Sequence, residues 1–262
     1  MDLGIKGNVA LVTASSGGLG RASAESLALE GVDLVLNGRN KDRLDKTVSE
    51  IRKITGVKVV GVPGDIRDPE TLNKMVDTAI NDFGKLNHVV TCAGGPPSKS
   101  FLDTTDDEWY TAFDMLVMSV VRLARISSEH LKKSGGNIVC ITSISVKEAI
   151  ENLVLSNSVR MSVIGLVKTL SRELGPEIRV NAVLPGAHET SRIQNLIQDA
   201  IDGGRVENYQ EGLAGWSKDV PLNRIGDPRE LGDVVAFICS KRASYLNGIS
   251  IPIDGGSSRS NL

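Results

Sequence analysis

The sequence is poor in aromatic residues and in cysteine. Of its 262 residues, 3% are aromatic and three are cysteines. Cys92, Cys140 and Cys239 lie far apart in apolar runs, with no cysteine or histidine at metal-ligand spacing. This pattern argues against a disulfide framework and against a metal site. We therefore expect reduced, buried thiols and no bound metal.

The sequence also lacks a strong excess of either charge. The chain has 30 basic and 32 acidic residues, which gives a formal net charge of -2. Such a balance offers no electrostatic footprint for nucleic acid or for an anionic membrane surface. No apolar run approaches the ~20 residues needed to span a bilayer, and no signal-peptide pattern precedes the first apolar run. We expect a cytoplasmic protein that acts on a small-molecule substrate.

Apolar runs alternate with helical patterns along the whole chain. The length and the 40% hydrophobic content suit one large α/β domain, over residues 1–262. Strands are expected at residues 9–12, 32–36, 57–62, 88–92, 137–142, 179–184 and 249–253. Strands that alternate with helices through right-handed crossovers predict a Rossmann-type, doubly wound parallel sheet with helices on both faces.

The helix over residues 69–83 has the clearest pattern, because apolar side chains recur there every three or four positions. Pro69 suits its first turn and Gly84 its end. Two long helices are expected over residues 106–133 and 152–174, and both have apolar residues on more than one face.

The polar segment over residues 191–219 has Ile193, Leu196, Ile197 and Trp216 among charged neighbours. This pattern favours an amphipathic lid that closes on a substrate. A surface excursion or a subunit contact is the alternative.

The stretch Thr13-Ala-Ser-Ser-Gly-Gly-Leu-Gly20 joins the first strand to the first helix. Glycines let the backbone come close to a pyrophosphate, and a helix N-terminus directs free amides at negative charge. Three other loops should meet it at the carboxyl edge of the sheet, namely those at residues 91–94, at Ser143 and at residues 185–186. The pattern predicts a dinucleotide site.

With these motifs in place, the chain resembles the short-chain dehydrogenase/reductase family over nearly its whole length, most closely the β-ketoacyl-reductase-like branch. Residues 13–20 match the family's T-G-x-x-x-G-I/L-G, with Ala14 in place of the first glycine. Residues 91–94 keep the last two letters of N-N-A-G, and residues 185–190 match P-G-x-x-x-T. The resemblance implies cofactor contacts at Ala14, Ser16, Gly17, Leu19, Gly20, Arg39, Asp65, Ile66, Ala93, Gly94, Arg160, Pro185, Gly186, His188 and Thr190.

The catalytic residues depart from the family pattern. In the family, a serine is followed thirteen residues later by a tyrosine and, four residues after that, by a lysine. Here Ser143 is kept, but Ser156 and Arg160 stand at the other two positions, and Leu116 stands where the family has an asparagine. A serine hydroxyl does not titrate near neutral pH and arginine stays charged, so neither can shuttle protons as tyrosine and lysine do.

Three functions remain open from the sequence. The first is an NAD(P)(H)-dependent reductase of a small carbonyl or conjugated enone, whose product anion is delocalised and needs little acid catalysis. The second is a 3-oxoacyl-thioester reductase with a substituted proton relay. The third is a cofactor-binding protein without turnover, serving as a sensor or subunit. Lys147, Glu148 and His188 lie near the catalytic positions, although each also fits a purely structural role.

The resemblance also implies a cofactor preference and an oligomeric state. The family's NAD-selecting acid falls at Gly38, and Arg39 follows it, so we expect NADP(H) to be preferred and NAD(H) to be possible. Related proteins pair their two long helices across two-fold axes, so a homo-oligomer, a tetramer, is expected.

Overall fold

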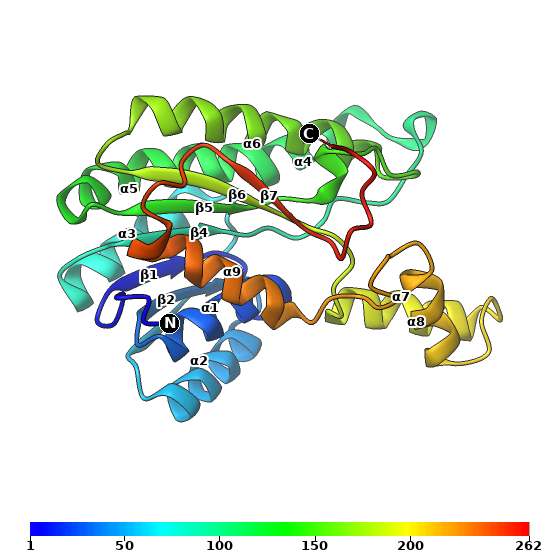
Figure 1. Ribbon diagram of the computed structural model, residues 1–262, viewed down its shortest axis with the longest axis horizontal. Coiled ribbons are helices and arrows are strands. Elements are labelled where there is room, and N and C mark those ends of the chain that lie inside the picture. Colours follow the sequence, from blue (N-terminus) through cyan, green and yellow to red (C-terminus); the bar gives the residue numbers. More distant parts are fainter. Residues whose placement is uncertain (262) are drawn as a thin grey trace.

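A single parallel sheet forms the centre of the computed structural model, which describes residues 1–261 apart from the side chain of Asp199 (Figure 1). The strands are β1 (Val9–Val12), β2 (Asp33–Gly38), β3 (Val59–Pro63), β4 (His88–Thr91), β5 (Asn137–Ile141), β6 (Arg179–Pro185) and β7 (Ser250–Ile253). Their order in the sheet is β3-β2-β1-β4-β5-β6-β7, and all neighbours pair in parallel. The expected Rossmann-type doubly wound sheet is confirmed, and its strand order reverses between β1 and β4. Residue 262 of the expected domain lies outside the described residues.

Helices cover both faces of the sheet. They are α1 (Gly18–Leu29), α2 (Lys41–Thr55), α3 (Pro69–Phe83), α4 (Asp106–Phe113), α5 (Ser119–Ser134), α6 (Val154–Glu173), α7 (Ser191–Asp202), α8 (Tyr209–Ser217) and α9 (Pro228–Cys239). Helices α3, α4, α5 and α6 share one apolar core with the sheet, and α1, α2 and α9 share the core on the opposite face (Figure 1).

Local sequence signals set the ends of α3 as predicted. The Asp68 carboxylate accepts hydrogen bonds from the backbone amides of Glu70 and Thr71, and Pro69 lies in the first turn. Gly84 ends the helix in the left-handed conformation, with φ 78°.

The predicted long helix over residues 106–133 is interrupted. Helix α4 passes through a π-helical turn, η2 (Asp114–Met118), before α5 begins. Apolar spacing did not reveal this turn, because buried residues on both sides of it, such as Ala112, Leu116 and Val120, belong to one core and keep helical spacing. The second long helix begins at Val154 rather than at residue 152, because Asn152 has a left-handed backbone with φ 56°.

Helices α7 and α8 lie to one side of the sheet (Figure 1). They occupy most of the expected segment 191–219, so its helical character is confirmed, and its role as a lid stays a prediction. Ile193 and Ile197 of α7 form a small apolar cluster with Ile225, separate from the two cores of the sheet.

No helix in the described part of the chain is long and apolar enough to cross a membrane.

Candidate active site

The loops at the carboxyl edge of β1 and β4 are tied together by one buried side chain. Thr13 Oγ1 donates a hydrogen bond to the Cys92 carbonyl and accepts one from the Cys92 amide, each at 2.7 Å. The glycine turn is thereby fixed beside the loop over residues 91–94, at the point where the strand order reverses. This is the crevice in which doubly wound sheets bind their ligands.

The glycine turn presents the open N-terminus of α1. Gly17 precedes the helix and offers no capping side chain, so the first amides of α1 have no side-chain acceptor there. A Cβ on Gly20 would lie 2.6 Å from the Ala14 carbonyl oxygen, so only glycine allows this close approach of helix and strand. Ala14 itself has φ 46°, a conformation that costs an alanine ~1 kcal/mol or more. These features fit the pyrophosphate of a dinucleotide.

A cavity of about 480 Å³ opens beside this turn. Its lining includes Ser16, Gly17 and Thr190, which were all expected to contact the cofactor. Thr190 lies close to Gly18, because a Cβ on that glycine would meet the Thr190 methyl at 3.8 Å. The volume is typical of a small-molecule site.

Arg43 is a cavity residue that the sequence analysis missed. Its Nε donates to the Ser16 carbonyl at 2.9 Å, and its guanidinium covers Gly17. It comes from the first turn of α2, which follows β2 directly. The signal available was its place in the first turn of the helix that directly follows β2, close to the expected cofactor residue Arg39.

Arg39 and Asp65 follow β2 and β3, as expected. Arg39 is exposed, and its charge is one of the influences that lower the pKa of Asp65. The larger cause is the ion pair with Arg67, which holds the Asp65 carboxylate at 2.8 Å. Ile66 beside it is buried. An adenine contact at Asp65 would therefore share that carboxylate with Arg67.

Pro185 and Gly186 lie at the end of β6. The Gly186 amide donates to the Ile253 carbonyl, and a Cβ there would lie 2.8 Å from Asp254. His188 is 4% exposed, and its Nδ1 lies 3.1 Å from the Gly186 carbonyl. Burial lowers the pKa of His188, which favours its neutral form. A cofactor contact at His188 would be made through its backbone.

The three serines after β5 lie together, and one of them was not predicted. The Ser143 hydroxyl accepts from the Ser145 amide, and the Ser145 and Ser156 hydroxyls lie 3.1 Å apart. Ser156 is buried, at 6% exposure. Sequence spacing could not identify Ser145, because the loop over residues 143–146 forms a tight turn that directs it at α6.

Arg160 lies one turn after Ser156 on α6 and is 8% exposed. Its Nη1 donates to the Thr142 carbonyl at 3.1 Å, and its Nη2 lies 3.5 Å from the Gly94 carbonyl. Its Nε has no partner among the described residues. Burial lowers the pKa of Arg160 to about 10, so the side chain stays charged at neutral pH.

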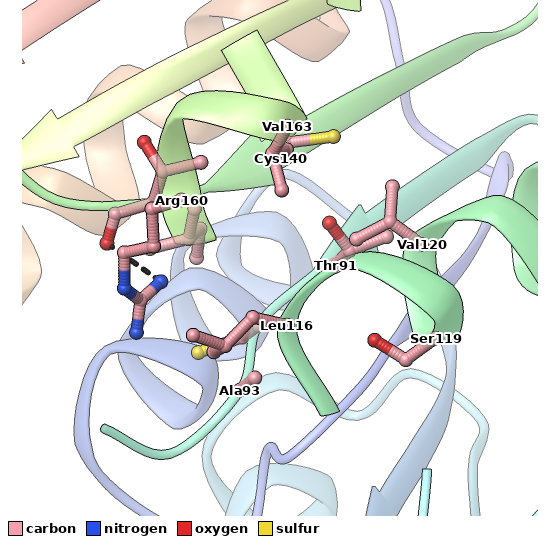
Figure 2. Close-up of a pocket in the computed structure, with 11 residues that line it drawn as sticks. Thr91, Ala93, Leu116, Ser119, Val120, Cys140, Arg160 and Val163 are labelled. Carbon is pink, nitrogen blue, oxygen red and sulfur yellow. Dashed lines mark hydrogen bonds between the residues drawn. The ribbon is translucent and has the colours of Figure 1, made fainter. Parts of the chain in front are cut away.

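Figure 2 shows the surroundings of this guanidinium. Leu116 of the π-helical turn and Ala93 line the same small cavity as Arg160, together with Ser119 and Thr142. The enclosed space is about 10 Å³, close to the lower limit for one water molecule. This enclosed space alone is therefore too small for a substrate.

Lys147 and Glu148 form no ion pair with each other in the part of the chain that the structure describes. The Glu148 carboxylate instead accepts from the Arg259 amide at 2.8 Å. Cys140 and Cys239 are buried as expected, whereas Cys92 is half-buried in the site loop. Within residues 1–261 no group of three metal-ligating side chains comes together.

The parallel sheet, the glycine turn and the polar cluster after β5 define a dinucleotide-binding α/β protein. The sequence family described as enoyl-(acyl carrier protein) reductase matches residues 13–258. The chain therefore belongs to the short-chain dehydrogenase/reductase family of oxidoreductases.

Relatives match along almost the whole chain. A 3-oxoacyl-[acyl-carrier-protein] reductase of Aquifex aeolicus is 31% identical over 258 residues, 98% of this chain and 99% of the relative. Dehydrogenase/reductase SDR family member 4 of Sus scrofa is 30% identical and covers 96% of this chain and 88% of its own. The structure of L-sorbose reductase from Gluconobacter frateurii, complexed with NADPH and L-sorbose, aligns with TM-score 0.95 and 30% identity over 99% of this chain and 100% of its own.

Proposed function

We propose that the protein is an NADP(H)-preferring reductase of a small carbonyl compound or conjugated enone that works without a tyrosine–lysine pair. The observation that carries this proposal is Arg160, a buried cation one helical turn from a buried serine. Ser143, Ser156 and Arg160 are the proposed catalytic residues.

The cofactor is held by the glycine turn and by residues around the cavity beside it. NADP(H), when bound, supplies or accepts the hydride. Arg39 and Arg43 provide positive charge near β2, which suits a 2′-phosphate. The NADPH complexes of L-sorbose reductase and of actinorhodin polyketide ketoreductase support this cofactor choice.

The three proposed catalytic residues have different roles in the reaction. Ser143 offers a hydroxyl that orients an acceptor oxygen. The Ser156 hydroxyl is hydrogen-bonded to the Ser145 hydroxyl and is a poor acid at neutral pH. Arg160 keeps its positive charge and stabilises negative charge that develops on the acceptor. An enone fits this arrangement best, because hydride addition to its β-carbon gives a delocalised enolate that water can protonate.

One observation favours a second function, a 3-oxoacyl-thioester reductase with a substituted relay. The paired Ser145 and Ser156 hydroxyls form a short chain along which a proton can be passed. The relay would make Ser156 essential, which the enone mechanism does not. The third possibility, a cofactor-binding sensor or subunit without turnover, needs neither serine.

Cofactor oxidation tests the three proposals together. NADPH consumption is measured on cyclohexenone, its saturated ketone and an acetoacetyl thioester. We expect kcat/KM to be highest for the enone. Preferential reduction of the thioester would support the relay instead, and tight NADPH binding without turnover on all three would support the non-catalytic function.

We also propose that the chain assembles as a homotetramer through the faces of its long helices. Tyr110 and Phe113 of α4 and Met161 of α6 expose 74%, 43% and 49% of their surface, although they are large and apolar. Surfaces of this kind mark subunit contacts. Light scattering at micromolar concentration should give four times the chain mass, and a monomer would contradict the proposal.

A further inference from the structure

Within the part of the chain that the structure describes, no negative side chain lies beside the positive charge of Arg160. Its guanidinium contacts only the carbonyl oxygens of Thr142 and Gly94, and Nε contacts no acceptor in the described residues. The charged or titratable groups that act on it are the Cys92 thiol and a second arginine, Arg192. Burial raises the pKa of that thiol to about 11, so at neutral pH it carries no charge to balance Arg160.

Arg192 comes from the first turn of α7 and reaches the same loop. Its guanidinium packs directly against Gly95, at the place that a Cβ would fill. Arg160 touches the neighbouring Gly94 carbonyl, at 3.5 Å. Both glycines are exposed. The guanidinium groups of Arg160 and Arg192 thus come from different segments and lie against two neighbouring exposed glycines.

The cofactor does not balance these charges. The hydroxyls of a nicotinamide ribose accept or donate hydrogen bonds but carry no charge. A reduced nicotinamide ring is neutral, and an oxidised ring adds another positive charge. In the proposed function the cofactor phosphates lie elsewhere, with the pyrophosphate at the N-terminus of α1 and the 2′-phosphate near Arg39 and Arg43.

A buried charge without a counter-charge costs several kcal/mol, and a ligand that supplies the missing charge recovers part of that cost. A carboxylate is the chemical group that suits guanidinium best, because it accepts two parallel charge-assisted hydrogen bonds. The remaining component of the site that can carry such a group is the substrate.

We propose that Arg160 and Arg192 together bind the carboxylate of an acidic substrate, so that the acceptor is a keto acid or an enone acid. The inference rests on the proposed reductase function for its chemistry. Because Arg192 belongs to α7, the substrate carboxylate also joins the segment over residues 191–219 to the loop after β4.

Binding of benzoate and benzamide tests the anion site without turnover. Isothermal titration is performed on the protein saturated with NADPH, at constant ionic strength and without chloride. We expect benzoate to bind at least tenfold more tightly than its uncharged isostere. Arg192→Gln should weaken benzoate about tenfold and leave benzamide unchanged.

Arg172→Gln is the matched control. It removes the same charge from an exposed position on α6, twelve residues or ~18 Å along the helix from Arg160. Its benzoate affinity should equal that of the unmodified protein. Equal affinity for benzoate and benzamide, or full benzoate binding by Arg192→Gln, overturns the proposal.

Steady-state kinetics then separate this inference from the proposed function. β-Acetylacrylate should be reduced with at least tenfold higher kcat/KM than its methyl ester, and Arg192→Gln should abolish that preference for the acid. Equal rates for acid and ester overturn the anion site and leave the reductase standing. Selective benzoate binding without reduction of either compound supports the anion site and defeats the reductase.

Discussion

His88 and Arg160 are two buried bases at opposite edges of the same sheet, and they respond differently to burial. His88 begins β4, and its two ring nitrogens lie 2.9 and 3.0 Å from the side-chain amides of Asn8 and Asn137. Burial lowers its pKa to about 4, so it is neutral. Arg160, equally buried at the other edge, keeps its charge.

The difference lies in what each base finds around it. A neutral imidazole accepts a hydrogen bond at one ring nitrogen, so one of the two asparagine amides can donate to His88 without any charge on the ring. Among residues 1–261, Arg160 finds only backbone acceptors, and its Nε has no partner. The amino edge of the sheet thus holds an uncharged polar ring, with the neighbouring Asn137 Oδ1 left without a partner among the described residues, whereas the carboxyl edge keeps a charge that a ligand can pair.

Arg160→Met should have the largest effect and should move activity and stability in opposite directions. Loss of the cation should lower kcat/KM by 10²- to 10³-fold, because Arg160 is the buried cation one helical turn from Ser156 that stabilises developing negative charge in the proposed reaction. The free energy of unfolding should rise by about 1–3 kcal/mol, since an unpaired buried charge is removed. Enzyme assays and urea unfolding measure the two quantities, and a variant that loses both would contradict the comparison.

His88 should make the free energy of unfolding depend on pH. Its pKa of about 4 lies below the ordinary value of 6.5, so the unfolded chain binds more protons between these values. Stability contributed by neutral His88 is complete above pH 6.5 and is lost as the pH falls toward 4, by roughly 3 kcal/mol.

Urea unfolding of His88→Gln across the same pH range isolates this contribution. The variant starts less stable but should lose roughly 3 kcal/mol less than the unmodified protein on acidification. His188→Gln is a second variant for comparison with His88→Gln, because burial lowers the pKa of His188 as well. Identical pH profiles for His88→Gln and the unmodified protein would show that burial does not lower the pKa of His88.

Arg39 extends the comparison to an exposed cation. Arg39→Ala should raise the Kd of NADPH about tenfold and leave that of NADH unchanged, since one charge-assisted contact to the 2′-phosphate is lost. Lys41→Ala removes a neighbouring exposed charge that is already paired with Asp45 and should change neither. Equal affinity of the unmodified protein for both cofactors would refute the assignment.

The smallest effects are expected at the serines. Ser156→Ala should lower kcat/KM less than tenfold, because its hydroxyl is tied to Ser145 and is not needed as an acid. Ser143→Ala should fall between Ser156→Ala and Arg160→Met. Rates measured from pH 5 to 10 decide the order, and a loss at Ser156 larger than that at Arg160 would favour the proton relay.

The fold could be predicted from the sequence because its signals are local. Asp68 and Gly84 mark the ends of α3, and the alternation of apolar runs with helices is enough for a parallel sheet. The π-helical turn at Asp114–Met118 escaped prediction. In such a turn the backbone hydrogen bonds run from residue i to i+5, but buried residues such as Ala112, Leu116 and Val120 keep helical spacing across it.

The candidate site could be predicted only where the spacing of residues in a motif fixes their positions in the fold. Spacing placed Ser156 and Arg160 on one buried face of α6, and the structure confirms that placement. Ser145, Arg43 and Arg192 were missed as site residues because their approach depends on contacts between segments far apart in the chain. That no acidic side chain of the described residues lies near Arg160 is likewise a property of the folded chain, not of the sequence around it.

The apolar cluster under α7 and α8 has a consequence for how such a chain can change over evolutionary time. Because Ile193, Ile197 and Ile225 pack apart from the two cores of the sheet, substitutions on the surface of these helices leave folding of the sheet intact. The segment that carries Arg192 can therefore vary and acquire new specificities, while the sheet that positions the glycine turn stays the same.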